Sequence, residues 1–411
     1  MKKKAIKRNL LGLFLVIFLD LLGVGIIIPV LAPLFYSSGS AFVPAHWDEQ
    51  TINLTYGLLI GIYPIMQFFG APILGSLADR FGRKKLLTTS LVGTLIGYLI
   101  TGFGILTGQL WMVFAGRGLD GFTGGNIAVA NSAIADMSSE EDRASNFGLV
   151  GAAFGLGFIF GPFLGGILSN PEVLPWFNSA TPFWATAILT TINLFVIAAV
   201  FKETLKESIL TKLSIFTGFQ NLRKAMHMTE MHAIFFVTFL HQFGFAFFTQ
   251  FFPVYLVSKF QYTEMEIGLL FGYTGIWIAF GQGILTRIVA KFAGPVKALK
   301  RSLLVLSLSL GSLLLATAPW MFFFIKPMIA MAEGVTFPNT TAVASNLSPS
   351  NKQGEVMGII SSIRAAGMAI PPLAAIVLLT INQNLAILSS AGIVLLAWLA
   401  FMYGFRKTES V

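Results

Sequence analysis

The chain of 411 residues contains no cysteine, which excludes disulfide bridges, thiolate metal sites and thiol nucleophiles. It is also poor in charge, because only 11% of its residues are Asp, Glu, Lys or Arg, whereas 55% are hydrophobic. The mean hydropathy of +0.78 agrees with this balance. No class of soluble domain has such a composition. The sequence therefore predicts an integral protein of the lipid bilayer with several spans.

Apolar runs of membrane-spanning length follow one another along the whole chain. The basic start before the first run is similar to a secretory signal, but that run is too long and contains Asp20 and Pro29. We therefore interpret it as a retained first helix. We expect twelve spans in all, at 10–36, 54–78, 86–107, 110–135, 145–168, 182–201, 232–257, 266–290, 301–318, 320–346, 355–380 and 384–404.

The net charge of +9 is explained by where the basic residues lie. Nearly all of the 27 Lys and Arg fall in alternate connectors, whereas the opposite connectors contain only Lys259. The positive-inside rule then predicts that both termini are cytoplasmic. A partnership with nucleic acid is not expected, since the charge sorts by membrane side. The absence of long polar tails favours the inner (plasma) membrane of a bacterium.

An internal repeat divides the chain into two six-helix halves. Residues 57–74 match residues 268–285 at nine of eighteen positions, and the longest polar connector, 202–231, lies between spans six and seven. We expect an N-terminal bundle at 1–201, a cytoplasmic linker at 202–231 and a C-terminal bundle at 232–411. Parallel halves of this kind are typical of carriers whose substrate site is exposed to each side of the membrane in turn.

The connector after the second span has the most specific pattern in the sequence. It places Gly75, Asp79, Arg80, Gly82 and Arg83 at the spacing G-x-L-A-D-R-x-G-R-K. Asp79 can accept backbone N–H groups at the start of a neighbouring helix or pair with an arginine. The alternative is a simple basic stop signal at the cytoplasmic face.

This connector closely resembles the signature of the major facilitator superfamily, and the resemblance extends over nearly the whole chain. Arg117-Gly118-Leu119-Asp120-Gly121 is similar to the intramembrane arginine motif of that superfamily. The run from Gly157 to Gly166 resembles the G-x-x-x-G-P-x-x-G-G motif of its drug:proton antiporter branch. The opening Leu19-Asp20-Leu21-Leu22-Gly23-Val24-Gly25 is similar to the tetracycline-resistance exporters.

The resemblance implies an all-α membrane protein with twelve transmembrane helices in two pseudo-symmetric six-helix bundles. It also implies export, with a small-molecule substrate and protons as partners and no cofactor. We expect a monomer, because the two halves already form the transport path.

The resemblance further implies a gate on the cytoplasmic side. Asp79 and Arg83 would join Asp136, at the end of span four, and Arg364 of span eleven in a charge network that stabilises the outward-facing state. The second half lacks this acid, since Thr286 and Ala290 occupy the positions equivalent to Gly75 and Asp79.

The glycine motif of span five has its own physical account. Gly157, Gly161 and Gly165 fall four residues apart and form one smooth helix face, followed by Gly166, while Pro162 removes an intrahelical hydrogen bond. Such a face lets the two halves approach closely and bend against each other. Ordinary packing of small residues between helices is the alternative.

Ionised side chains near the membrane midplane are costly and point to function. Asp20 lies about 15 Å into its span by the helical rise, so it is a candidate proton carrier or a structural carboxylate near Gly23 and Gly25. Arg117 and Asp120 are three residues apart, which permits either an ion pair or a proton-coupling role. Glu333 lies seven residues after Lys326 and is a candidate proton or substrate group, or a structural partner.

A polar stripe of His241, Gln242 and Gln250 runs through the phenylalanine-rich seventh span. Packing is one interpretation of these side chains, and a substrate cavity is the other. His241 is the only histidine expected within a span, and no second ligand accompanies it at metal-binding spacing, so we expect no metal. The predicted cavity residues are Tyr63, Gln67, His241, Gln242, Gln250, Tyr273, Gln282, Lys326 and Glu333.

The ninth span departs from the tetracycline exporters, which carry a functional acid there. Residues 302–319 contain no ionisable group, which argues against tetracycline as the substrate. We therefore predict proton-coupled export, by alternating access, of a small amphipathic drug or metabolite that is zwitterionic or anionic.

Other functions are open to the same fold. A proton symporter that imports a nutrient or metallophore is the first alternative, and a lipid-flipping or non-transporting membrane protein is the second. An enzyme is not expected, because the chain has no G-x-S-x-G elbow, no H-E-x-x-H and no phosphate-binding P-loop.

Overall fold

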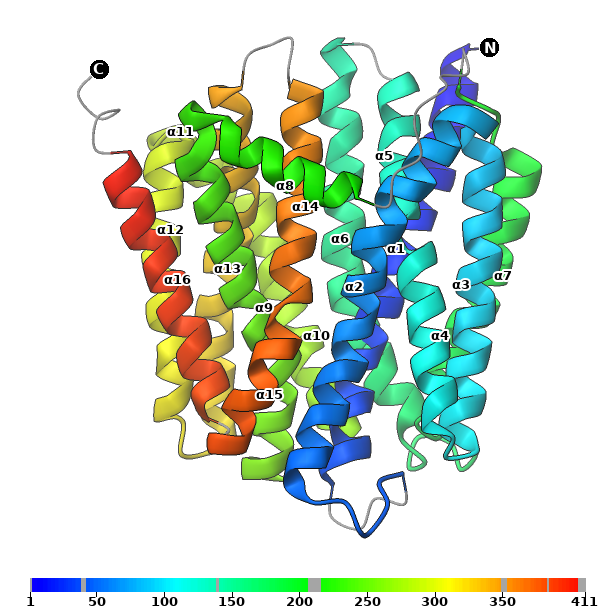
Figure 1. The fold of residues 1–411 in the computed structure, drawn as a ribbon, viewed down its shortest axis with the longest axis vertical. Coiled ribbons are helices and arrows are strands. Elements are labelled where there is room, and N and C mark those ends of the chain that lie inside the picture. The colour runs from blue at the N-terminus through cyan, green and yellow to red at the C-terminus, as the bar shows by residue number, and fades with distance from the viewer. Residues whose placement is uncertain are drawn as a thin grey trace. The chain divides into compact units, whose positions relative to one another are not determined.

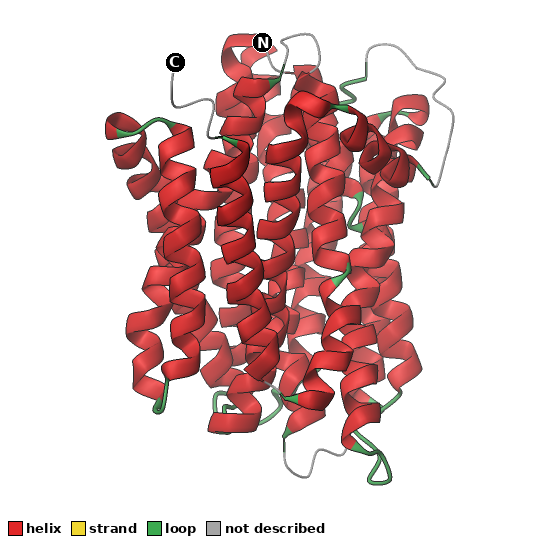
Figure 2. Cartoon of the chain, turned by 60° about the vertical axis from the view of Figure 1, so that its left-hand side comes forward, coloured by secondary structure: helices red, strands yellow, loops and turns green. Residues whose placement is uncertain are grey.

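The structure is a computed structural model that describes residues 2–37, 42–137, 140–205, 216–348, 353–382 and 384–405. Within these ranges the regular structure is entirely helical (Figures 1 and 2). Each predicted span corresponds to a helix or to consecutive helical segments, so the predicted fold class is confirmed. The helices that cover the first six spans are α1 (Lys2–Tyr36), α2 (Glu49–Phe81), α3 (Arg83–Leu106), α4 (Leu110–Thr123), α5 (Asn126–Met137), α6 (Glu140–Ser169) and α7 (Thr181–Val200).

The second half of the sequence continues in the same way. A short helix, α8 (Thr217–His227), precedes the seventh span and hydrogen-bonds α14 through Asn221 Nδ2 and Ser362 Oγ, 3.0 Å apart (Figure 1). It lies in the predicted linker, of which residues 206–215 are outside the described residues. The remaining helices are α9 (His232–Phe260), α10 (Glu264–Phe280), the π-helical turn η2 (Gly281–Leu285), α11 (Thr286–Phe292), α12 (Pro295–Ser312), α13 (Phe322–Leu347), α14 (Gln353–Ala369), α15 (Pro371–Ile381) and α16 (Asn384–Gly404), with single 3₁₀ turns at Thr229–Met231, Leu313–Leu315 and Pro319–Met321.

Ten helical stretches of the described chain are long and apolar enough to cross a membrane. Two predicted spans are not among them. Gly124 and Gly125 break the span at 110–135 into α4 and α5, and the span at 145–168 is represented by a shorter apolar stretch of α6, Gly155–Ser169. A similar break separates α14 from α15 at Ile370, where two prolines follow. Proline cannot donate the intrahelical hydrogen bond, so a helix ends or kinks where it occurs.

The chain folds into two compact units. Unit 1 contains Met1–Pro44, Ile62–Thr217 and Thr263–Gly272, and unit 2 contains Ala45–Gly61, Gly218–Tyr262 and Tyr273–Val411. The first part of α2 therefore packs with unit 2, and the first part of α10 packs with unit 1. The sequence-based division into bundles at 1–201 and 232–411 stays a prediction.

In unit 1 the glycine motif of α6 packs on α1. A Cβ atom on Gly161 would lie 2.8 Å from the Cα of Gly25, and one on Gly157 would lie 2.6 Å from the Cβ of Leu21. Gly165 packs in the same way on Ile26. These three glycines therefore allow close packing between two helices of the same unit. Gly166 packs on Gly268 at the start of α10, the segment that unit 1 receives from the second half of the sequence.

Candidate functional site

A buried charged cluster lies in the core of unit 1. Arg117 and Asp120 are both on α4 and both buried, and Arg117 Nη1 donates to Asp120 Oδ2 over 2.7 Å. The guanidinium also lies over the ring of Tyr63, with 4.5 Å between Cζ and the ring centre. Arg117 thus combines an ion pair with a cation–π contact, and the pairing that the i,i+3 spacing permitted is present.

Glycines bring the helices that carry this cluster together. A Cβ on Gly121 of α4 would collide with the backbone oxygen of Tyr63 on α2. A Cβ on Gly97 of α3 would lie 2.9 Å from the carbonyl oxygen of Gly116 and 3.0 Å from Asp120 Cβ. Close contact of α2, α3 and α4 is therefore possible only because these positions lack side chains.

Asp20 belongs to the same cluster. Its side chain on α1 is 3% exposed, and its Oδ2 atom has no hydrogen-bond partner. It lies beside the amide of Asn126, and Asp120 is close enough to act on it electrostatically. Two carboxylates and one guanidinium thus share the core of unit 1.

Two members of this cluster were missed by sequence reasoning. Asn126 follows the Gly124–Gly125 break and is fully buried, and the hydroxyl of Tyr98 packs directly against Gly23, one turn from Asp20. Both are polar residues within apolar spans, and this feature of the sequence could have identified them as candidates. Gln67, a predicted cavity residue, donates from Nε2 to the carbonyl oxygen of Gly124 over 3.2 Å and so stabilises the break between α4 and α5.

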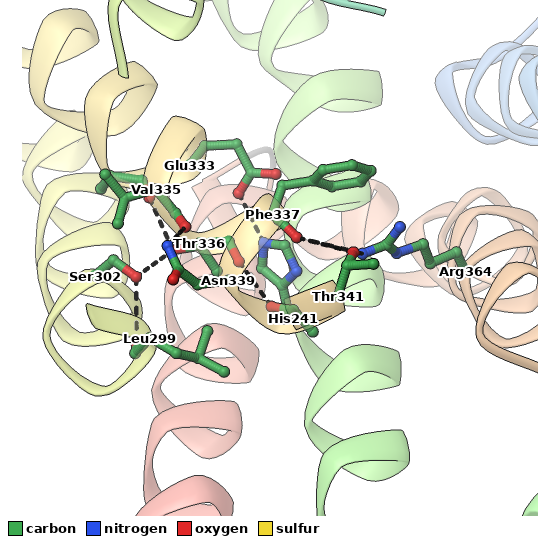
Figure 3. A network of polar contacts seen from close by, with 12 residues as sticks. His241, Leu299, Ser302, Glu333, Val335, Thr336, Phe337, Asn339, Thr341 and Arg364 are labelled. Carbon is green, nitrogen blue, oxygen red and sulfur yellow. Dashed lines mark hydrogen bonds and ion pairs between the residues drawn. The ribbon is translucent and has the colours of Figure 1, made fainter. Parts of the chain in front are cut away.

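A second buried cluster lies in the core of unit 2 (Figure 3). His241 Nε2 on α9 and Glu333 Oε2 on α13 are 2.7 Å apart and hydrogen-bonded, and both side chains are buried. The other ring nitrogen, Nδ1, is buried and has no hydrogen-bond partner. The structure thus brings together two residues that the sequence placed 92 positions apart.

Arg364 of α14 reaches the same stretch of α13 (Figure 3). Its Nη2 donates to Thr341 Oγ1 over 2.8 Å and to the Phe337 carbonyl oxygen over 3.4 Å, and its Cζ lies 4.0 Å from the centre of the Phe337 ring. Glu333 is close enough to act on it electrostatically. The contacts of Arg364 in the structure are with α13 of the same unit, and its expected part in the network of Asp79 stays a prediction.

Lys326 is the fourth ionisable group in the core of unit 2. It is fully buried near the start of α13, whereas Arg364 contacts the later part of that helix. Its side-chain nitrogen lies 4.5 Å and 4.6 Å from the ring centres of Phe248 and Phe252. Part of the phenylalanine-rich face of α9 therefore surrounds a cation. In the structure the carboxylate of Glu333 is hydrogen-bonded to His241.

The other predicted cavity residues of unit 2 divide into two groups. Gln250 donates to the carbonyl oxygen of Met368 over 3.1 Å, and Gln242 packs on Gly367, so both contact α14. Gln282 lies in η2 against the backbone of Gly334, next to Glu333. Tyr273 contacts the start of α13 instead, where its hydroxyl donates to the carbonyl oxygen of Phe323 over 3.0 Å.

A third charged group forms at the connector between α2 and α3 in unit 1. Arg83 Nη1 pairs with Asp79 Oδ1 at 2.6 Å, and Arg83 Nε pairs with Asp136 Oδ2 at 3.1 Å. Three of the residues predicted for the gate therefore make one network. Arg80 is exposed and lies over the Phe81 ring, and a Cβ on Gly75 would meet no atom within 4 Å.

Glu203 completes this network and was not singled out from the sequence. Its two carboxylate oxygens accept the backbone N–H groups of Arg83 and Lys84, at 2.9 Å and 3.1 Å, where α3 begins. Gly82 precedes them with φ +101°, a conformation that favours glycine, and a Cβ there would press on the Glu203 carboxylate. The sequence feature that could have indicated this role is an acid directly after the sixth predicted span.

The hydrogen bonds to Glu203 change its acidity. Partial burial raises the pKa of its carboxyl, but backbone N–H groups of Leu205, Arg83, Lys84 and Thr204 bond the charged form and bring the pKa below its usual value. The carboxylate thus occupies the positive N-terminal end of α3 in its ionised form.

Comparison with known proteins agrees with this architecture. A family model described as the Major Facilitator Superfamily matches residues 13–372 and 234–410. The chain is 33% identical over 356 residues to the class C tetracycline resistance protein of Escherichia coli, covering 86% of this chain and 85% of the relative. It is 34% identical over 351 residues to the class G protein of Vibrio anguillarum, covering 85% and 84%.

Solved structures show the same fold. The crystal structure of the human organic anion transporter MFSD10 matches with a TM-score of 0.73 at 23% identity, covering 96% of this chain and 99% of that one. The D-xylose–proton symporter matches with a TM-score of 0.75 at 15% identity, covering 96% and 97%.

Proposed function

Because this chain belongs to the Major Facilitator Superfamily, we propose that it is a proton-coupled exporter that exchanges a small amphipathic drug or metabolite for protons. Its similarity to tetracycline resistance proteins supports export, since removing a drug from the cell is how a transporter confers resistance. The proposal includes alternating access by a monomer in a bacterial inner membrane, with both termini cytoplasmic.

The observation that carries this proposal is the buried carboxylate of Asp20. An ionised acid within a membrane span is costly, and such residues commonly serve as proton relays. Asp20 Oδ2 has no hydrogen-bond partner, whereas Arg117 is engaged by Asp120. A purely structural carboxylate would be expected to have both oxygens satisfied.

The charges of this cluster set how many protons it can hold. Asp20, Asp120 and Arg117 carry a net charge of one negative when both acids are ionised. Binding one proton makes the cluster neutral, so we propose that one proton is taken up here per cycle. Arg117 pairs with the second acid, Asp120, over 2.7 Å, and Glu333 with His241 is a second candidate site for a proton.

The conformational cycle is assigned to the remaining motifs. The Arg83 network with Asp79, Asp136 and Glu203 is proposed as the gate that stabilises the outward-facing state. The glycine face of α6 is proposed to support close packing of α6 on α1 during the cycle. The substrate is proposed to be a compound other than tetracycline, because residues 302–319 contain no ionisable group.

Reconstituted protein tests the proposal. Liposomes with an imposed pH gradient and a pH-sensitive dye inside are exposed to a panel of amphipathic drugs and metabolites that includes tetracycline. We expect at least one compound to dissipate the gradient while it moves in the direction opposite to the protons. Movement in the same direction as protons would establish a symporter, and movement without protons would establish facilitated diffusion; either result contradicts the proposal.

A further inference from the structure

Among the described residues, the interior of unit 2 contains Arg364, Lys326, His241 and one acid, Glu333. Glu333 is hydrogen-bonded to His241. When these two residues share one proton, the pair is neutral, and the charge of Arg364 then has no buried counter-ion among the described residues.

Arg364 is held by neutral partners. A hydroxyl, a carbonyl oxygen and an aromatic ring contact its guanidinium. Such partners orient an arginine without cancelling its charge. Glu333 acts on Arg364 from nearby, but its carboxylate is hydrogen-bonded to His241 (Figure 3).

Two nitrogen atoms of this group lack a hydrogen-bond partner although they are buried. They are Arg364 Nε and His241 Nδ1, and the His241 side chain is 1% exposed. Buried polar atoms are nearly always hydrogen-bonded, so each exception calls for an explanation such as a missing ligand. The Arg364 residue as a whole is partly exposed, whereas its Nε atom is buried.

We propose that unit 2 contains the binding site for a negatively charged group of the substrate. Arg364 receives a carboxylate or sulfonate through its free Nε and the adjacent Nη, in the bidentate geometry that suits such groups. His241 Nδ1 can donate a second hydrogen bond to this group when the imidazole is protonated. Glu333 is then an internal anion that moderates the charge of Arg364.

This inference rests on the proposed function, because it names the substrate class of the same transporter: amphipathic organic acids and zwitterions. The phenylalanine rings around the cations, Phe337, Phe248 and Phe252, suit the apolar body of such a compound. The competing account is structural, with Arg364 joining α14 to α13 and His241 packing against Glu333.

Equilibrium binding to the purified full-length protein separates these accounts without any proton gradient. The probes are dansylglycine, dansylglycinamide and monodansyl-ethylenediamine, which share one fluorophore and differ in charge. We expect the carboxylate to bind with an affinity at least about 10-fold higher than the amide and the amine, the value of one charge-assisted hydrogen bond. Equal binding of the three probes, preference for the amine, or no saturable binding of the carboxylate would overturn the proposal.

Variants locate the site. Arg364→Gln should reduce carboxylate affinity about 10-fold or more, and Arg364→Lys should restore part of it. Arg301→Gln removes an exposed arginine of the same unit and serves as the matched control. Thermal unfolding of each variant shows whether it has folded, and the ranking of probes on the unmodified protein stands without any variant. Unchanged affinity in folded Arg364→Gln would contradict the assignment.

The two proposals fail in different ways. If the dye experiment shows no proton exchange while the carboxylate preference and its loss in Arg364→Gln persist, the coupling is wrong and the anion site stands. If protons are exchanged but the probes show no preference, the anion site is wrong and the coupling stands.

Discussion

At the scale of single residues, Glu203 connects two parts of the chain that are distant in sequence. Its carboxylate bonds the first N–H groups of α3, 120 positions earlier, beside the guanidinium that bridges Asp79 and Asp136. It therefore fixes the backbone of Arg83 while the two aspartates fix the side chain. Loss of this carboxylate should loosen the whole network.

The pH dependence of Glu203 follows from its lowered pKa. Its usual value is 4.5 and the folded value is lower, so this group stabilises the folded state above pH 4.5 and ceases to do so as the pH falls through the folded pKa. Glu203→Gln should cost about 0.5–1 kcal/mol near neutral pH, the range for an exposed helix cap, and less in acid. Thermal unfolding at a series of pH values measures this.

Glu172→Gln is the matched control, because Glu172 is an exposed acid of the same unit. It should leave the unfolding temperature and its pH dependence unchanged. An identical pH profile for the unmodified protein and Glu203→Gln would show that the capping bonds contribute nothing.

Side-chain partners were the part of the site that the sequence predicted least well. Spacing along one helix gave the Arg117–Asp120 pair, since i and i+3 share a face. The same reasoning related Glu333 to Lys326 on α13, whereas the structure pairs Glu333 with His241 of α9. Contacts between helices depend on how the helices rotate against one another, which no single-helix pattern records.

At the scale of elements, glycine spacing was informative because it reports packing distance. The four-residue interval of Gly157, Gly161 and Gly165 predicted a smooth helix face, and that face packs on α1. What the spacing could not identify was the neighbouring helix. The breaks after α4 and α14 were similarly present in the sequence as Gly124–Gly125 and Pro371–Pro372 but were absorbed into single predicted spans.

Gly161 and Gly75 should respond differently to the same change. A Cβ on Gly161 would lie 2.8 Å from both Gly25 Cα and the Leu22 oxygen, whereas one on Gly75 meets nothing within 4 Å. Gly161→Ala should destabilise the protein by about 1–3 kcal/mol, as overpacking does. Gly75→Ala should be neutral or stabilising by up to about 1 kcal/mol, because alanine favours the helix.

Unfolding of the two variants in the same detergent makes this comparison. Equal destabilisation by both substitutions would contradict the packing described for α1 and α6, because Gly75 is free of steric contact. Equal tolerance of both would mean that α6 can shift on α1 at little cost.

At the scale of the whole molecule, composition and hydropathy were sufficient for the fold class, because a bilayer requires long apolar helices. The internal repeat also indicated two halves. It did not indicate that residues 45–61 and 263–272 would each pack with the opposite compact unit. That exchange involves the starts of α2 and α10, the same two helices that show the repeat most clearly.

The two units differ in how their buried charged groups are engaged. In unit 1 the carboxylate of Asp20 has an oxygen without a hydrogen-bond partner, whereas in unit 2 the carboxylate of Glu333 is hydrogen-bonded to His241 and the guanidinium of Arg364 contacts neutral groups. This difference is the basis for assigning the proton to unit 1 and an anionic group to unit 2.

The central claim is that Asp20 binds the proton that is exchanged for substrate. Its most direct test is proton release when a transported compound is added to the purified protein in weakly buffered detergent solution. The unmodified protein should release about one proton per compound bound, and Asp20→Asn should release none. Asp48→Asn, which removes an exposed aspartate, should release as many protons as the unmodified protein. Full proton release from Asp20→Asn would contradict the account.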